Sequence, residues 1–210
     1  MEDVLDLYHE PYDETRPVIC FDETSKELHG HKRDPLPAKP GAVARIDTHY
    51  ERHGTQMIHL ATEPLTGWVT ATATERRRTV EWIEQMVELA ETHYPDAACI
   101  RVVLDNLSTH NPAAFYRFFP PDQARAYLDR FEFHFTPTHG SWLNIAEIEI
   151  GALKRQCLGR RITHAATLRS EVAAWQAARN GADGLIDWQF TTDDARIKLR
   201  SLYPVPLDED

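Results

Sequence analysis

Two short apolar runs, each ending in an aspartate, constrain the fold of this chain more than any other feature of its sequence. Pro17–Asp22 reads Pro-Val-Ile-Cys-Phe-Asp, and Ile100–Asp105 reads Ile-Arg-Val-Val-Leu-Asp. Short apolar runs bounded by polar residues are typical of strands buried inside a sheet. We therefore expect a sheet in which two buried strands each end in a carboxylate.

Further strands are predicted beyond a proline-rich loop. Residues 34–41 contain three prolines and one glycine, which neither a helix nor a central strand accommodates. After this loop, Gln56–Thr62 and Trp68–Thr72 indicate two strands joined by a turn, and Phe131–Thr136 indicates one more. The sheet therefore has about five strands, since a sheet of about five is a common size.

Helices are expected between and after these strands. The apolar residues of Thr79–Tyr94 recur at helical spacing, with Thr79 available as the N-cap and Pro95 beyond the end. Three further helices are predicted over residues 142–158, 165–180 and 192–200. This order of elements predicts an α/β fold, in which helices flank a mixed sheet.

Composition excludes several classes of protein. The chain has 210 residues, 42% of them hydrophobic and 27% charged, which excludes disordered and fibrous proteins. No stretch approaches the roughly 20 apolar residues of a membrane span, and Met1-Glu2-Asp3 is acidic where a signal peptide is basic. We therefore expect a soluble cytoplasmic protein. The three cysteines lie far apart and predict neither a disulfide framework nor a zinc ribbon.

The charge is acidic overall but unevenly distributed. A formal net charge of -10 argues against a stand-alone nucleic-acid binder, because phosphate neutralisation usually needs a basic domain. Residues 151–170 are the exception and carry a local charge of +5 without any acid, from Lys154, Arg155, Arg160, Arg161 and Arg169. This stretch is either a DNA-binding surface or simply the solvated face of a helix.

The two strand-ending aspartates, Asp22 and Asp105, are candidate metal ligands. A buried carboxylate is costly unless it is paired or bound to a metal, and two on adjacent strands repel each other. A hard divalent cation such as Mg²⁺ prefers oxygen ligands and would relieve this repulsion. The alternative is that each aspartate merely caps the turn or helix that follows it.

A third carboxylate is expected from the predicted helix 142–158, where Glu147 and Glu149 are both candidates. They point about 200° apart on a helix, so only one of them can face a metal held by the aspartates. The apolar stripe of this helix leaves both glutamates on its margins, so periodicity does not choose between them; the stripe consists of Ala146, Ile150, Leu153 and Cys157.

Two longer motifs resemble a known family. Residues 103–110 read Val-Leu-Asp-Asn-Leu-Ser-Thr-His, and residues 134–147 read His-Phe-Thr-Pro-Thr-His-Gly-Ser-Trp-Leu-Asn-Ile-Ala-Glu. Together with the opening Phe-Asp-Glu, they resemble the catalytic domain of bacterial insertion-sequence transposases, in the insertion sequence 630 branch of the mariner-like superfamily. The resemblance runs from about residue 17 to residue 180. It implies a ribonuclease H-like DDE catalytic domain over 17–180, preceded by a tail (1–16) and followed by a C-terminal helix and acidic tail (181–210).

The resemblance also implies the site and its chemistry. Matched position by position, the acidic triad falls on Asp22, Asp105 and Glu147, which would hold two Mg²⁺ ions, with Mn²⁺ as a substitute. Two such ions can activate an attacking water or 3′-hydroxyl and stabilise the leaving oxygen. The implied function is DNA strand cleavage and strand transfer, at transposon ends and target DNA, by a homodimer associated with the bacterial nucleoid.

Nearby polar residues are candidates for supporting the metal ligands. These are Asn106, His110 and Asn144, since metal-bound carboxylates are usually held by further hydrogen bonds. The alternatives are that each asparagine makes a turn and that the histidine is an ordinary core or surface residue. His29-Gly30-His31 predicts a polar loop, because no further ligands complete a tetrahedral metal site.

The chain also departs from the family. Asp105 and Glu147 are separated by 41 residues, a long spacing that we attribute to an insertion over Phe115–Asp129. Only about 16 residues precede the first strand, so the helix-turn-helix DNA-binding module of such transposases is expected on a separate or missing segment. Two other functions stay open: a ribonuclease H-like nuclease or resolvase, and a non-catalytic DNA-binding or regulatory descendant.

Overall fold

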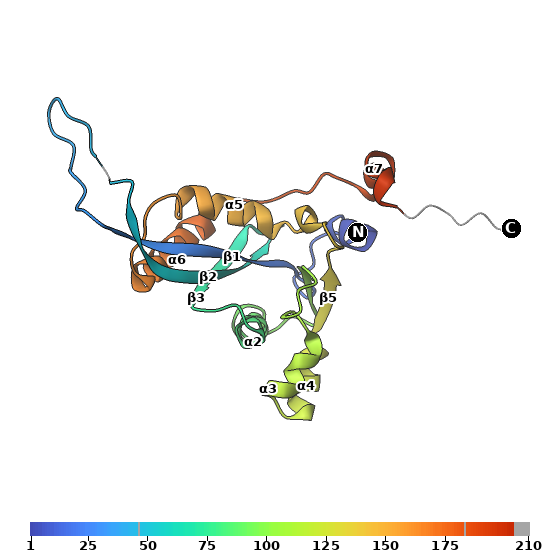
Figure 1. Ribbon diagram of the computed structural model, residues 1–210. Coiled ribbons are helices and arrows are strands. Elements are labelled where there is room, and N and C mark those ends of the chain that lie inside the picture. The colour runs from blue at the N-terminus through green and yellow to red at the C-terminus, as the bar shows by residue number, and fades with distance from the viewer. Residues whose placement is uncertain (46, 183, 204–210) are drawn as a thin grey trace.

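The fold is built on one mixed sheet of five strands. The computed structural model describes residues 1–45, 47–182 and 184–203. The strands are β1 (Val18–His31), β2 (Tyr50–Glu63), β3 (Trp68–Thr74), β4 (Ile100–Leu104) and β5 (Phe131–Phe135). Their order across the sheet is β3-β2-β1-β4-β5 (Figure 1). Strand β2 is antiparallel to both of its neighbours, β1 and β3, whereas β4 and β5 are parallel to β1. The predicted α/β architecture is confirmed.

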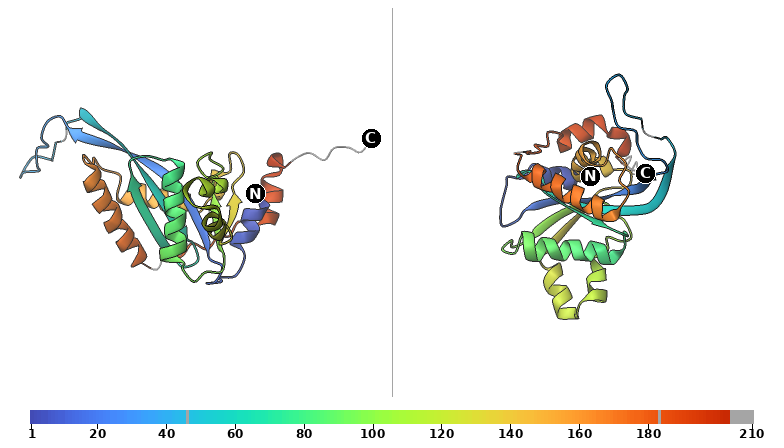
Figure 2. Two further views of the ribbon diagram at one scale, coloured as in Figure 1. Left: turned by 90° about the horizontal axis from the view of Figure 1, so that it is seen from below. Right: turned by 90° about the vertical axis from the view of Figure 1, so that its left-hand side faces the viewer.

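Helices cover both faces of this sheet (Figures 1 and 2). They are α1 (Glu2–Tyr8), α2 (Thr79–Glu88), α3 (Phe115–Phe118), α4 (Pro121–Leu128), α5 (Ala146–Gln156), α6 (Ala165–Asn180) and α7 (Thr192–Lys198). One buried core joins the sheet to α1, α5 and α6, and a second joins it to α2, α3 and α4. None of the helices that the structure describes is long and apolar enough to cross a membrane.

Strand β1 supplies side chains to both cores in alternation. Ile19 and Phe21 belong to the core beneath α2, whereas Cys20 belongs to the core beneath α5. Successive residues of a strand point to opposite faces. Asp22 therefore lies on the α5 side of the sheet, and Glu23 lies on the α2 side.

Strands β1 and β2 are longer than predicted and form a hairpin that extends beyond the helices (Figure 1). The polar loop predicted for residues 29–31 was wrong, because β1 continues through them. His29 and His31 pair with β2, and the His29 ring packs 4.0 Å from the Tyr50 ring. The proline-rich loop over 34–41 is confirmed and lies at the exposed tip.

The first predicted helix differs at both ends. Its N-cap is Arg78 rather than Thr79, and the backbone N–H of Arg78 donates to the side chain of Glu81 at 2.9 Å. The α-helix ends at Glu88, and residues 89–93 continue as one π-helical turn. A single π-helical turn at the end of an α-helix is too short to interrupt the apolar pattern of the whole segment, so the pattern did not reveal the change.

The regions outside the sheet are more ordered than predicted. The segment 1–16 begins with α1 instead of being a tail, because Val4 and Leu5 are fully buried in the core. Arg196 on α7 pairs with Glu2 on α1, which ties the C-terminal helix to the N-terminal one. The acidic tail at 204–210 lies outside the described residues. Residues 115–129 form α3 and α4 and bury Phe115 against Trp82.

Candidate active site

The register of the two central strands sets Asp22 and Asp105 side by side. Cys20 on β1 pairs with Val103 on β4, and both side chains belong to the α5-side core. Two residues further along the chain are Asp22, which is still within β1, and Asp105, and the negative charge of Asp105 acts on Asp22. Asp105 directly follows the end of β4. The sheet therefore gathers the two aspartates that the sequence placed on separate strands.

Asp22 is electrostatically coupled to the other two acids. Its pKa is raised to about 7, chiefly by burial, and the negative charges of Glu147 and Asp105 raise it further. The backbone N–H of Glu23 opposes the shift by donating to Asp22 Oδ1 at 2.7 Å. Every side-chain charge that shifts Asp22 is negative. Glu147 and Asp105 are therefore close enough to Asp22 for their charges to act on it.

Glu149, the alternative third acid, has a different environment. It is 2% exposed, and Arg179 on α6 donates hydrogen bonds to both of its carboxylate oxygens, at 2.8 and 2.6 Å. Glu147 is exposed at the start of α5 and acts on Asp22 through its charge. Glu149 therefore joins two helices, whereas the charge of Glu147 acts on Asp22.

Asn144 fastens the start of α5 to the sheet. Its side chain is almost fully buried, donates to the backbone oxygen of Phe21 at 2.8 Å and accepts from the backbone N–H of Ala146 at 3.2 Å. Phe21 precedes Asp22, and Ala146 precedes Glu147. One amide group thus connects the backbone beside one acid to the backbone beside another.

His110 lies between two carboxylates on the α2 side of the sheet. Its Nε2 is 2.9 Å from Glu23 Oε1, and its Nδ1 is 2.8 Å from Asp105 Oδ1. Burial opposes the charged ring, but hydrogen bonds with Asp105 and Glu23 outweigh it and raise the pKa of His110 to about 9. The ring is held between Phe21 and Trp82, at 5.7 and 5.8 Å between centroids.

Glu23 is the residue of this cluster that sequence reasoning missed. Its side chain is 1% exposed, and its Oε2 is buried without a hydrogen-bond partner among the described residues. A glutamate directly after Asp22 alternates to the other face of the sheet, into an apolar layer. In the sequence, this alternation and the presence of His110 were the only signals that Glu23 could form a buried pair with a histidine.

Asn106 is exposed and forms part of an open pocket beside Asp105. The pocket has a volume of about 250 Å³, and its opposite wall is the segment that precedes α5, including Thr136, Thr138 and Ser141. His139 in that wall adopts a φ of 63°, a left-handed conformation that is uncommon outside glycine. Among the described residues, the side chain of Asn106 makes no hydrogen bond to a predicted metal ligand, so its predicted supporting role has no contact in favour of it.

The four predicted DNA-binding residues lie in two different environments. Lys154 and Arg155 are exposed on the last turn of α5. Arg160 pairs with Glu171, and Arg161 donates to the backbone oxygens of Thr48 and His49, where the loop of the hairpin enters β2. The basic stretch is therefore partly a solvated surface and partly an anchor for the hairpin.

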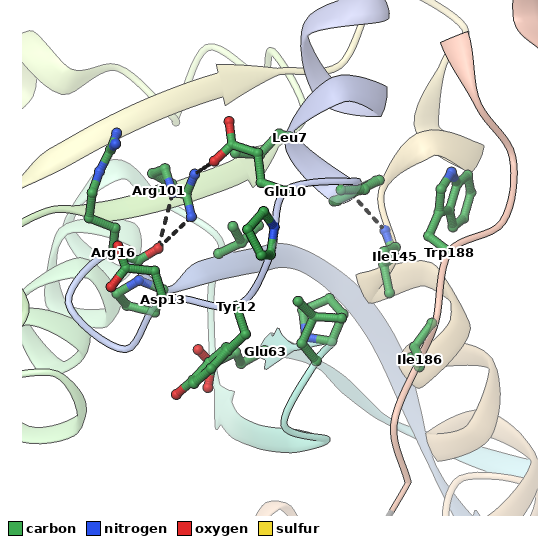
Figure 3. Close-up of a pocket in the computed structure, with 16 residues that line it drawn as sticks. Leu7, Glu10, Tyr12, Asp13, Arg16, Glu63, Arg101, Ile145, Ile186 and Trp188 are labelled. Carbon is green, nitrogen blue, oxygen red and sulfur yellow. Dashed lines mark hydrogen bonds and ion pairs between the residues drawn. The ribbon is translucent and has the colours of Figure 1, made fainter. Parts of the chain in front are cut away.

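An apolar cavity lies at the other end of the central strands (Figure 3). Its volume is about 20 Å³, room for about one water molecule, and Arg101, Arg16, Glu63 and Trp188 are among its lining residues. Arg101 donates to the backbone oxygen of Arg16 at 3.0 Å, which fixes the chain between α1 and β1. None of the three clustered acids lines this cavity.

The donor set of the acidic cluster fits a hard divalent cation. Asp22, Asp105 and Glu147 offer carboxylate oxygens, the ligand type that Mg²⁺ and Mn²⁺ prefer. Among the described residues, the group whose potential ligand atoms all lie within 4.8 Å of one another is a second one, formed by Glu23, Asp105 and His110. In that second group both nitrogens of His110 already face carboxylate oxygens, so it suits an ion pair better than a metal.

Comparison with known proteins agrees with this arrangement. Residues 17–169 match the family model described as DDE superfamily endonuclease. The fold is similar to that of the Mos1 mariner paired-end complex with Mn, with a TM-score of 0.56 and 16% identity over 84% of this chain and 52% of that chain. The Mos1 complex with the left transposon end has a TM-score of 0.56 and 14% identity over 89% of this chain and 61% of that chain. Among curated proteins, none matches.

These similarities show the ribonuclease H-like fold that the motifs implied. The chain spans about half to three fifths of the Mos1 chains it matches. Identities of 14–16% carry the fold and not the substrate or the partner.

Proposed function

This chain belongs to the DDE superfamily of endonucleases, and on that premise we propose that it is the catalytic domain of a transposase that cleaves DNA and transfers its 3′-hydroxyl ends. The observation that carries the proposal is the cluster of three acids from β1, the end of β4 and the start of α5. The assignment to the insertion sequence 630 branch stays a prediction from the motifs.

We assign Asp22, Asp105 and Glu147 as the ligands of two Mg²⁺ ions, which Mn²⁺ can replace. Divalent ions bound by these oxygens supply activation of a water or 3′-hydroxyl and stabilisation of the leaving oxygen. The raised pKa of Asp22 supports the assignment. Burial and the neighbouring negative charges disfavour its ionised form, and a bound cation would stabilise that form.

The protein's own residues hold the ligands in place. Asn144 bonds the carbonyl of Phe21 and the N–H of Ala146, and so keeps Glu147 next to Asp22. Glu149 and Arg179 hold α5 against α6. A rigid arrangement of ligands matters because small displacements of reacting groups reduce rates strongly.

We propose DNA as the partner, with Lys154 and Arg155 as the exposed phosphate contacts on α5. Arg160 and Arg161 lie further along the same basic stretch and have intramolecular partners, so we expect them to contribute less. A homodimer and a helix-turn-helix module on another segment are part of the proposal. They are supported by the similarity to the Mos1 paired-end complex, of whose chain the matched part is about half.

Cleavage of labelled DNA in Mn²⁺ or Mg²⁺ tests the proposal. We expect the wild-type chain to nick DNA and the Asp105→Asn and Glu147→Gln variants to lose this activity by at least about a hundredfold, as for removal of a catalytic group. Glu84→Gln is the matched control, because it makes the same chemical change at an exposed glutamate on α2. Cleavage retained by Asp105→Asn would refute the proposal.

A second assay separates a transposase from a nuclease. A DNA duplex with a free 3′-hydroxyl end is incubated with target DNA and the chain. Joined products support strand transfer, whereas hydrolysis without joining supports the nuclease or resolvase alternative.

A further inference from the structure

A buried side-chain chain runs from Glu23 through His110 to Asp105. Glu23 Oε1 lies 2.9 Å from His110 Nε2, and His110 Nδ1 lies 2.8 Å from Asp105 Oδ1 and 3.1 Å from the backbone oxygen of the same residue. The side chain of His110 is fully buried and that of Glu23 is 1% exposed, while that of Asp105 is 31% exposed. Only the last member of the chain reaches the surface.

Each member comes from a different part of the fold. Glu23 is on β1, where it points to the face opposite Asp22. Asp105 ends β4, and His110 follows in the next turn, where its backbone N–H donates to Leu107 at 2.9 Å. The rings of Phe21 and Trp82 pack against the imidazole. The imidazole therefore has little freedom to rotate.

We propose that Glu23 and His110 are positioning residues, which fix the rotation of the Asp105 carboxylate so that it binds a divalent metal ion together with Asp22 and Glu147. This rests on the proposed function. Asp105 Oδ1 is buried and lies 2.8 Å from His110 Nδ1 as an ion pair, without a hydrogen-bond partner among the described residues. The other carboxylate oxygen, Oδ2, is therefore the one accessible to a metal. A carboxylate at a strand end without such a contact would rotate freely between orientations.

The other interpretation of the same atoms is a metal site formed by Glu23, Asp105 and His110 themselves. A metal there would have to displace one of the two contacts of the imidazole. It would also have to reach Glu23, whose side chain is 1% exposed. The geometry therefore favours a hydrogen-bonded chain that supports the metal site from behind.

Two substitutions of His110 separate the two contacts. In His110→Asn the amide nitrogen can replace Nδ1 and keep the contact with Asp105, whereas in His110→Gln it can replace Nε2 and keep the contact with Glu23. We expect His110→Gln to weaken Mn²⁺ binding about 10- to 100-fold, as is typical for partners of metal ligands, and His110→Asn to weaken it less. Mn²⁺ binding is measured by electron paramagnetic resonance and calorimetry on the full chain.

Two further variants complete the comparison. Glu23→Gln leaves the core volume unchanged and is expected to weaken Mn²⁺ binding by a smaller factor than His110→Gln, because it acts through the imidazole. Glu81→Gln is the matched control, a buried glutamate in the same layer that pairs with Arg78 instead. It is expected to leave Mn²⁺ affinity unchanged. Thermal melting identifies any variant that fails to fold, and Glu23→Gln then carries the test.

The outcomes distinguish this proposal from the proposed function. The metal site is supported if wild type binds Mn²⁺ and Asp105→Asn does not. If folded His110→Gln and Glu23→Gln then bind Mn²⁺ as tightly as wild type, the positioning role is wrong although the metal site is correct. If wild type does not bind Mn²⁺, or Asp105→Asn binds it unchanged, the site itself is wrong. A nitrogen hyperfine coupling of bound Mn²⁺ that disappears in both His110 variants would overturn the positioning role, since it would make His110 a ligand.

Discussion

Arg179 on α6 donates two hydrogen bonds to the buried carboxylate of Glu149 on α5. This pair gives Glu149 a structural role between two helices and is the reason we propose Glu147 as the third metal ligand. A carboxylate that is 2% exposed and doubly hydrogen-bonded to a guanidinium has no oxygen to spare for a metal without losing its partner.

Removal of Arg179 should destabilise the fold. Arg179→Ala leaves Glu149 buried and unpaired, which we expect to lower the free energy of unfolding by about 2–4 kcal/mol; the usual cost is roughly 3–5, and the arginine side chain is 23% exposed. Urea denaturation measures the change. Glu147→Gln is the control and should change stability by less than about 0.5 kcal/mol, as surface substitutions do.

Asn144→Ala should weaken both the fold and the metal site. The substitution leaves the buried carbonyl of Phe21 without its donor, at a cost of about 1–3 kcal/mol. It also frees the start of α5, so we expect Mn²⁺ affinity to fall. Calorimetry on a variant shown to be folded at the assay temperature measures this. Full Mn²⁺ affinity in such a variant would show that Asn144 serves stability alone.

Glu63 should make stability depend on pH. Burial raises the pKa of this carboxyl above its ordinary value of 4.5, and its Oε1 has no hydrogen-bond partner among the described residues. A raised folded-state pKa contributes stability that is complete below about pH 4.5 and is lost as pH rises through the folded value. Glu63→Gln should therefore raise the Tm at pH 8 by a few degrees. For a chain of this size, such a shift corresponds to a gain of about 1 kcal/mol in the free energy of unfolding.

The comparison of Tm at two pH values isolates this effect. At pH 4, where Glu63 is protonated in the folded protein, Glu63→Gln and wild type should melt within about 1 °C of each other. A variant that is less stable than wild type at pH 8 would contradict the prediction.

Arg161→Ala should loosen the hairpin of β1 and β2. The guanidinium donates to the backbone oxygens of Thr48 and His49 and lies 5.8 Å from the centroid of the Tyr50 ring. Limited proteolysis should cut the exposed loop over 32–45 several times faster in this variant, since local unfolding exposes the chain. The Tm should change little. Arg160→Ala, whose partner is Glu171, is the control and should leave cleavage of the loop unchanged.

The strands and the apolar stripe of α5 could be predicted because they depend on local patterns. All five strands occur where apolar runs indicated them, and Ala146, Ile150, Leu153 and Cys157 are all buried. The lengths of β1 and β2 could not be predicted, because their exposed outer halves have no apolar alternation and exist by pairing with each other. Helix α1 was missed for a related reason, since only packing against the core makes so short a helix stable.

The sequence by itself determined that two apolar runs are each followed by a carboxylate and that a helix with two glutamates comes after them; it did not show that β1 continues beyond Asp22. Only the tertiary structure decided how those acids are used. Strand register sets Asp22 next to Asp105, the partner Arg179 removes Glu149 from consideration, and alternation along β1 sends Glu23 to His110 on the other face. These relationships join residues far apart in the chain, and a local pattern contains no information about which distant side chain will neutralise a buried charge.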